Sequence, residues 1–430
     1  MRGRGRLYLR SGRDQGRGDA QARRASAVPA PQHHGAGVSG RLRAFYFLYY
    51  GYVGASQGFL APWLRGLGFT GDAIGGVAMA AQLVSAPAGL FWAHAADRRD
   101  AREKTLRRCA FGAACALAFL PFARTPLQVG LVLAAHGFFG GALIPLADSV
   151  TMEWAVLEPG RSYARTRLFG SLGFVVVAQG LGLLLTARGD RPGDLLMPAV
   201  AAVSVLGYAL VARTLQGPAR TAPEPLTSAA FFPAATRILS DPAVALLFLV
   251  CVLHWAGCAP YHLLYGVLVR DHGLPASLTG LGLALGVLAE VIALFAFPAL
   301  LRRFSLSSLL VAASAGTIVR WVLLSRAHDA ASIVGLQLFH ALSFGVWWAA
   351  AVEAMRRSVP LQLRATGQAL FSALVFGAGN AIGYGLAGAG YQRFGSASPL
   401  FAFAAAVETA ALLFTALAAA RLGGVRATNA

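Results

Sequence analysis

The sequence predicts an all-α membrane protein whose twelve transmembrane helices form two six-helix bundles. Three observations carry this prediction. The 430 residues are 57% hydrophobic and only 13% charged, which is about half the charged share of a typical soluble domain. Apolar segments of about twenty residues, long enough to cross a bilayer, recur along almost the whole chain. A proline-rich stretch near the midpoint divides these segments six and six.

Short connections join the twelve segments, with one exception at residues 213–242, which contain five prolines. This stretch is the predicted linker between an N-terminal bundle (41–212) and a C-terminal bundle (243–420). The predicted spans are 43–64, 73–96, 107–123, 127–152, 168–187, 196–212, 243–264, 277–299, 307–324, 331–354, 366–388 and 397–420.

The two ends of the chain lie outside these spans. Residues 1–40 are rich in arginine, glycine and serine and contain no apolar core of a signal peptide. They predict a disordered basic tail, with a mis-assigned start codon as the alternative. Residues 421–430 form a short second tail.

The distribution of basic residues predicts the orientation. Leaving out the N-terminal tail, loops on the side of both termini carry 19 Arg and Lys, against 7 in the opposite loops. The positive-inside rule therefore places both termini in the cytoplasm. Because the basic residues follow the topology, the net charge of +19 needs no nucleic-acid partner.

The two halves resemble one another at an offset of 204 residues. "FWAHAADRR" at 91–99 lies over "FAFPALLRR" at 295–303, and His136 lies over His340. Such a repeat, with a site near the midplane between the halves, is typical of secondary transporters.

Nothing in the sequence points to an enzyme. The four cysteines lie in apolar segments without a CxxC pair, the chain has neither HExxH nor a P-loop, and its loops are too short to fold separately. We expect no catalytic residue, no metal and no cofactor. A membrane-embedded enzyme or sensor is the remote alternative.

The loop after the second span, "AHAADRRDARE", resembles the loop signature of the major facilitator superfamily. The stretches "RTRLFGSLGF" (165–174), "ALGVLAEV" (284–291) and "QLFHALSFGVWWAA" (337–350) are similar to the branch typified by the bacterial 3-phenylpropionate transporter. That branch is related to lactose permease and the nucleoside:proton symporters. The resemblance covers residues 41 to about 410.

The resemblance implies proton-coupled uptake of a small solute by alternating access, with an aromatic carboxylate such as 3-phenylpropionate as one candidate. A sugar or nucleoside symporter and an exporter of drug-like molecules stay open as alternatives. The expected location is the cytoplasmic (inner) membrane of a bacterium. The expected partners are a small-molecule solute, protons and the lipid bilayer, and we expect a monomer.

Three residues are candidates for proton coupling. Glu290 interrupts an otherwise apolar span, and a charge at that depth costs about 2.5–3.5 kcal/mol on insertion scales. It shares a small-residue face with Gly282 and Gly286. Arg320 in the next span is the nearest apparent counter-charge, and His340 lies in the tenth span. Either Glu290 takes up and releases a proton, or Glu290 and Arg320 form a fixed pair.

A second set of residues predicts the wall of a substrate cavity. Gln337, His340, Phe344 and Trp347 recur at the spacing of one helical face. Aromatic and amide groups on such a face could hold a ring and its polar group, with helix packing as the alternative. The other candidates, from the first and eleventh spans, are Tyr49, Tyr52, Gln57 and Asn380.

The remaining charged residues in or near the spans are candidates for a cytoplasmic gate. The family resemblance implies a latch made by Asp97, Arg98, Arg102 and Asp148. Glu353 ends the tenth span and Arg167 begins the fifth. Ordinary anchoring of loops is the alternative. Glu408, in the middle of the twelfth span, has no partner that the sequence identifies.

Overall fold

The computed structural model describes residues 35–98, 101–157, 162–216 and 228–427. Within these ranges the chain is helical apart from short connections, and it contains no strand. Most of the predicted basic tail lies outside the described residues. Residues 35–40 are an exception, because they form the start of the first helix and move the predicted boundary at residue 40 toward the N-terminus.

The first bundle contains the predicted spans 43–64 to 196–212. Its helices are α2 (Gly35–Gly66), α3 (Gly71–Arg98), α4 (Arg102–Leu117), the short η1 (Leu120–Phe122), α5 (Pro126–Gly140), α6 (Leu143–Leu157), α7 (Tyr163–Ala187) and α8 (Leu196–Arg213).

The second bundle follows a linker that contains α9 (Ser228–Leu239). Residues 217–227 of this linker lie outside the described residues. The helices are α10 (Pro242–Asp271), α11 (Ala276–Arg303), α12 (Leu306–Leu324), α13 (Ala330–Gly335), η2 (Leu336–Phe339), η3 (Ala341–Val346), α14 (Trp347–Ser358), η4 (Leu361–Leu363), α15 (Arg364–Phe371), η5 (Ser372–Gly379), α16 (Asn380–Phe394) and α17 (Ser398–Ala427).

Eleven helical segments in the described part of the chain are long and apolar enough to cross a membrane. The helix α2 is not among them, although it is 32 residues long, because tyrosines and an arginine-containing first part lower its hydropathy. It packs along α7 and α8, in the position of the predicted first span. The all-helical membrane fold is thus confirmed.

Local sequence sets where several helices begin. Thr125 accepts a hydrogen bond from the Gln128 backbone, Gln128 bonds back to the Thr125 backbone, and Pro126 is the first residue of α5. This reciprocal capping satisfies donors that a helix start leaves free. At the start of α10 the Asp241 side chain accepts from the backbone N–H groups of Ala243 and Val244, and Pro242 is the first residue of the helix.

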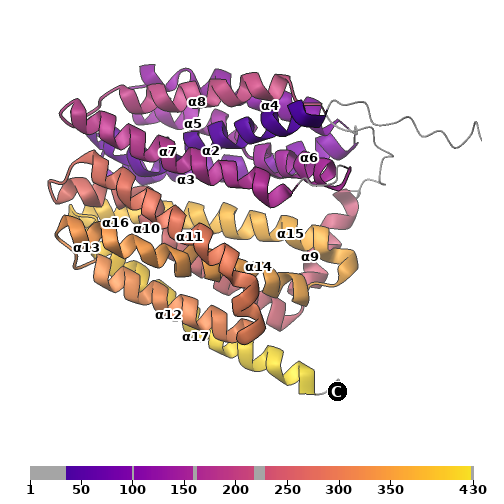
Figure 1. The fold of residues 1–430 in the computed structure, drawn as a ribbon. Coiled ribbons are helices and arrows are strands. Elements are labelled where there is room, and N and C mark those ends of the chain that lie inside the picture. Colours follow the sequence, from indigo (N-terminus) through magenta and orange to yellow (C-terminus); the bar gives the residue numbers. More distant parts are fainter. Residues whose placement is uncertain (1–34, 99–100, 158–161, 217–227, 428–430) are drawn as a thin grey trace, which may run out of the picture.

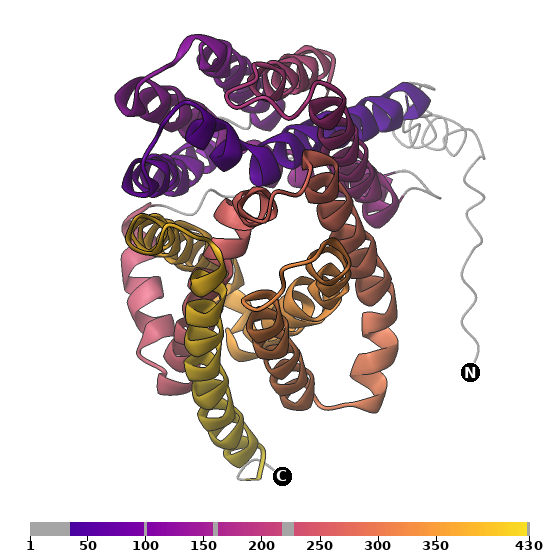
Figure 2. The ribbon, with the colours of Figure 1, turned by 90° about the vertical axis from the view of Figure 1, so that its left-hand side faces the viewer.

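The two bundles lie side by side. Figure 1 shows the first bundle above the second, with the start of α2 and the end of α17 at the same side. Most contacts between bundles run between α2 and α10, α3 and α16, and α7 and α11, and smaller sets join α3 to η5 and α2 to α11. We call the end opposite the two chain ends the distal end, and it faces the viewer in Figure 2.

Two spans of the second bundle are not regular α-helices. The tenth span changes from α-helix to a 3-10 turn (η2) and then to a π-helical segment (η3) before α14 begins. The eleventh contains a second π-helical segment, η5. Insertions of this kind are frequent at functional sites, and interrupted spans mark the binding region of transporters. Both segments lie on the helices that carry predicted site residues.

Candidate functional site

The three candidates for proton coupling lie together in the second bundle, in the order Arg320, His340, Glu290. The Arg320 guanidinium lies 3.3 Å from His340 Nδ1, and His340 Nε2 lies 3.2 Å from a carboxylate oxygen of Glu290. His340 therefore separates the two charges. The direct Glu290–Arg320 pair considered from the sequence is replaced by a pair bridged through an imidazole, because α13–α14 places His340 between α11 and α12.

The order of groups determines where hydrogen atoms can be placed. A guanidinium only donates hydrogen bonds, so Nδ1 of His340 accepts and Nε2 carries the hydrogen that Glu290 accepts. A second proton on His340 would point an N–H group at the N–H groups of Arg320. His340 thus donates to the Glu290 carboxylate and orients it.

Arg320 is completely buried. Its side chain donates to Gln337 Oε1 at 2.6 Å and lies against the rings of Tyr261, at 4.4 Å, and Trp321, at 4.5 Å. These amide and aromatic groups stabilise the cation without a carboxylate in direct contact. Glu290 is more accessible, since 29% of its side chain is exposed. Glu290 is thus partly exposed, whereas protein encloses the Arg320 guanidinium.

The residues predicted to share one face of the tenth span all contact α10 or α12. Gln337 and His340 contact Arg320 of α12. Trp347 is fully buried, donates to Ser314 Oγ of α12 at 3.0 Å and stacks on His254 of α10. The place of Trp347 in a cavity wall stays a prediction.

Phe344 belongs to an aromatic surface that the sequence identified only in part. Its ring lies 5.1 Å from His262 and 5.5 Å from Trp255, and Trp255 lies 4.8 Å from Phe376. Trp255 and His262 are on α10, and Phe376 is on η5. An aromatic residue in an apolar span carries no signal of its own, so sequence analysis missed these three.

Two polar atoms beside this surface have no partner among the described residues. They are the Trp255 Nε1 hydrogen-bond donor and the Asn380 Oδ1 acceptor. Asn380 follows Gly379, and a Cβ built at Gly379 would lie 3.4 Å from Trp255 Cβ. Buried polar groups are usually hydrogen-bonded, and the Asn380 side chain also lies within reach of His262. The prediction for Asn380 stays a proposal.

In the first bundle the predicted cavity residues of α2 lie among tyrosines and a charged pair. Tyr52 lies 4.7 Å from the His136 ring, and Tyr49 packs beside Tyr50. Arg167 on α7 donates to the Tyr50 hydroxyl, and 30% of its side chain is exposed. Gln57 is half-buried. Arg167 is thus more exposed than Arg320.

Arg102, one of the predicted latch residues, pairs with Asp97 and with an acid of α6 other than Asp148. It bonds to Asp97 at 3.0 Å and also contacts Ser149 and Glu153 of α6. Asp148 accepts from the Tyr46 hydroxyl at 2.6 Å and lies 3.7 Å from Arg167. The part of Asp148 in a latch stays a prediction.

Among the described residues, no ion pair joins the other two gate candidates, Glu353 and Arg98, to the opposite bundle. Glu353 binds Arg356 and Arg357 on its own helix, at 2.7 and 2.6 Å, and Arg98 is exposed. For Glu353 the structure favours anchoring of the helix end over a gate.

Comparison with known proteins identifies the family. A model of the MFS_1 like family matches residues 40–403. The chain belongs to this family. A probable 3-phenylpropionic acid transporter of Escherichia coli (strain K12) is 28% identical over 365 residues, covering 81% of this chain and 90% of that relative. A maltose permease of Geobacillus stearothermophilus is 26% identical over 343 residues, covering 79% and 83%.

Solved structures show the same fold. A mutant of the nucleoside transporter NupG superposes with a TM-score of 0.78 at 15% identity, over 89% of this chain and 99% of that one. The major facilitator resemblance is thereby confirmed. This MFS_1-like chain is a multi-pass transporter of the inner membrane.

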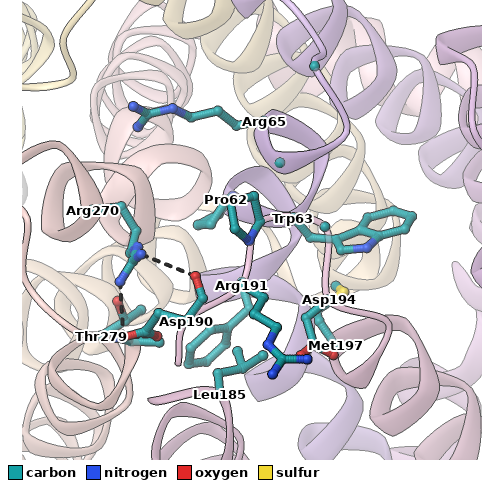
Figure 3. Close-up of a pocket in the computed structure, with 16 residues that line it drawn as sticks. Pro62, Trp63, Arg65, Leu185, Asp190, Arg191, Asp194, Met197, Arg270 and Thr279 are labelled. Atoms are coloured by element: carbon teal, nitrogen blue, oxygen red, sulfur yellow. Dashed lines mark hydrogen bonds and ion pairs between the residues drawn. The ribbon is translucent and has the colours of Figure 1, made fainter. Parts of the chain in front are cut away.

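In this MFS_1-like structure the two bundles are joined at the distal end. Arg65 at the end of α2 pairs with Asp271 at the end of α10, and Arg270 lies 3.2 Å from Asp190 in the connection after α7. Figure 3 shows Arg65, Asp190 and Arg270 around a pocket of about 400 Å³ between the bundles. Among the described residues, these are the ion pairs that join the bundles.

Glycines allow the helices to meet closely near the same end. A Cβ built at Gly75 of α3 would lie 2.6 Å from the Gly388 Cα of α16, and one at Gly266 of α10 would lie 1.8 Å from the Gly58 carbonyl of α2. Side chains there would force the bundles apart. The structure is therefore closed at the distal end.

We expect Asp190→Asn to open the distal end more often. Asp190 has a left-handed backbone (φ 53°), which asparagine also adopts, so the change removes charge and keeps the loop. The lost pair with Arg270 is partly exposed and should shift the closed–open equilibrium about two- to fivefold. Distances between spin labels at Leu127 and Ala331, exposed residues at the starts of α5 and α13, measure this equilibrium.

The matched control is Asp194→Asn. Asp194 bonds to Arg188, which lowers the pKa of its carboxyl, and to the Leu196 backbone. Both partners belong to the first bundle, so this variant should leave the equilibrium unchanged. Equal shifts in the two variants would mean that the Arg270–Asp190 pair does not hold the bundles together.

Proposed function

We propose that this transporter takes up a small aromatic carboxylate together with a proton, as a monomer. The observation that carries the proposal is the Arg320–His340–Glu290 arrangement beside the aromatic surface of Phe344, Trp255 and Phe376. A partly exposed carboxylate held by an imidazole can bind and release a proton, and the aromatic rings offer a stacking surface for an aromatic solute.

The carboxylate of the solute needs a cation. Arg320 was the first candidate, but it is fully buried and both of its terminal nitrogens are occupied. Arg167 is accessible and lies 4.2 Å from the Tyr50 ring. We therefore assign the solute carboxylate to Arg167 and the solute ring to the second bundle. A solute that contacts both bundles suits alternating access by rocking.

The orientation completes the proposal. The basic loops favour a cytoplasmic location for both termini; with that orientation the closed distal end faces outward, as expected of an inward-open state. The named relatives support transport of a small solute. A sugar or nucleoside is the second candidate class, and the unpartnered Asn380 and Trp255 groups favour it, because hydroxyl groups could satisfy them.

Uptake into proteoliposomes tests the proposal. We expect 3-phenylpropionate to accumulate when the outside is acidic and to equilibrate only when no pH gradient is imposed. Unlabelled maltose and uridine, tested as competitors, distinguish the alternative classes. Accumulation that ignores the gradient would exclude symport, and extrusion driven by an acidic exterior would indicate export.

Arg167→Gln tests the carboxylate site in the same assay. The variant should weaken the apparent affinity for 3-phenylpropionate by about 10- to 100-fold, since a hydrogen bond to a charged group contributes roughly 1.5–3 kcal/mol. Arg165→Gln is the matched control, because Arg165 is an exposed neighbour on α7. An unchanged affinity in Arg167→Gln would move the carboxylate site elsewhere.

A further inference from the structure

The second bundle contains a buried ionisable pair that the proposed mechanism does not use. His254 of α10 and Glu408 of α17 are both fully buried, and His254 Nδ1 lies 2.7 Å from Glu408 Oε2. The two residues are 154 positions apart in the sequence. Burying two ionisable groups is costly unless they are paired and hydrogen-bonded, so this arrangement needs an explanation beyond filling space.

The other ring nitrogen of His254 contacts the π-helical segment of the tenth span. His254 Nε2 lies 3.1 Å from the backbone carbonyl of Ser343 in η3. Because a carbonyl only accepts, Nε2 carries a hydrogen. The pair is then either an imidazolium with a carboxylate or a neutral imidazole with a protonated Glu408. Both arrangements are neutral overall and keep both hydrogen bonds.

His254 also fixes the residue that follows the π-helical segment. Its ring stacks on Trp347 with centroids 3.5 Å apart and planes at 6°. At the end of η3 the Trp347 backbone N–H donates to the Leu342 carbonyl, five residues back. A side chain that bonds to a helix carbonyl can stabilise such a local departure from α-helical bonding. His254 thus contacts both the middle and the end of the π-helical segment.

The π-helical segment connects this pair to the proton site. His340, which contacts Glu290 and Arg320, immediately precedes η3, and its ring stacks on Phe344 of η3 at 4.1 Å. In addition, Thr317 donates to Ser343 Oγ at 3.1 Å, and Thr317 lies on α12 one turn before Arg320. His340 therefore packs on the π-helical segment that His254 contacts, and the turn of α12 before Arg320 is hydrogen-bonded to the same segment.

We propose that His254 and Glu408 are positioning residues for proton coupling: together they hold the π-helical segment Ala341–Val346, and thereby His340, in register with Glu290. This inference rests on Glu290 being the proton carrier proposed above. It assigns a role to Glu408, for which the sequence identified no partner.

An infrared measurement on the purified full-length protein tests this without any solute. Difference spectra between acidic and neutral solution contain a carboxyl band for each acid that binds a proton. The Glu290 band is identified as the band that is missing from the spectrum of the Glu290→Gln variant. In Glu408→Gln and His254→Gln we expect this band to shift by several wavenumbers, because the hydrogen bond from His340 to Glu290 changes. Thr415→Val is the control, since Thr415 is a buried residue of α17 that bonds only its own helix.

Transport separates positioning from a general loss of structure. In Glu408→Gln, accumulation of 3-phenylpropionate driven by a pH gradient should fall several-fold while solute exchange without a gradient persists. If the pair were only structural, its loss would lower accumulation and exchange in parallel and would leave the position of the Glu290 band unchanged. Should Glu408→Gln not fold, Glu408→Asp retracts the carboxylate by one methylene, keeps its charge, and should shift the same band.

The outcomes distinguish this inference from the proposed function. A Glu290 band that is identical in the folded variants and in the wild type overturns the positioning role alone. A wild-type spectrum from which Glu290→Gln removes no band overturns the proton-carrier role and this inference with it. Failure of 3-phenylpropionate to be transported leaves the infrared result valid and overturns only the assigned solute.

Discussion

Glu290→Gln should abolish accumulation of solute driven by a pH gradient and spare exchange of solute across the membrane. Glutamine keeps the size of the side chain, and its amide oxygen can accept the hydrogen bond from His340 Nε2, which lies 3.2 Å from the native carboxylate. It cannot bind and release a proton. Exchange requires only that the loaded transporter alternate, so it should proceed near the wild-type rate in proteoliposomes.

Asp72→Asn is a suitable control, because Asp72 is an exposed acid in the first turn of α3. It should leave both activities unchanged. If Glu290→Gln loses exchange as well, Glu290 binds solute or holds the bundle together. If accumulation persists, the proton is carried by another group.

Gly75→Val should trap the transporter with its distal end open. A Cβ at this position would lie 2.6 Å from the Gly388 Cα and equally close to the Tyr384 carbonyl of α16, so the closed arrangement described here cannot form without movement of a helix backbone. Overpacking of this kind costs about 1–3 kcal/mol, so exchange should fall roughly 10- to 100-fold. Spin labels at Leu127 and Ala331 should report longer distances.

Gly76→Val is the matched control. Gly76 is the next residue of α3, and a Cβ there would meet nothing within 4 Å. Both variants place the same β-branched residue in the same helix and share its propensity cost. Comparable losses in the two would assign the effect to folding of α3, and not to closure of the distal end.

Much of the fold could be predicted because its signal is local. Apolar length and the charges between segments predicted the spans, and α3, α7, α11 and α12 lie close to the predicted boundaries. The His136–His340 repeat also agrees with the structure: His136 bonds the Ala113 carbonyl of α4 at 3.3 Å, and His340 contacts Arg320 of α12, the equivalent helix of the second half. Duplication preserves such pairs of neighbours.

The site could be predicted only in part, because partners depend on contacts between distant helices. Reasoning about charges in apolar spans found Glu290, Arg320 and Glu408. The same reasoning would have singled out His254 as an ionisable residue in an apolar span, but not its pairing with Glu408. No local pattern shows that Arg102 meets Glu153 in place of Asp148, since the choice depends on how α3 and α4 are placed against α6.

By itself, the sequence determined that this chain is a two-bundle membrane transporter and which of its spans carry ionisable groups, since hydrophobic length, charge asymmetry and the repeat act along the chain. Only the tertiary structure decided that His340 lies between Arg320 and Glu290, and that His254 is paired with Glu408. The physical reason is that each of these contacts joins different helices. Which helices pack against one another is not encoded in any pattern along the chain.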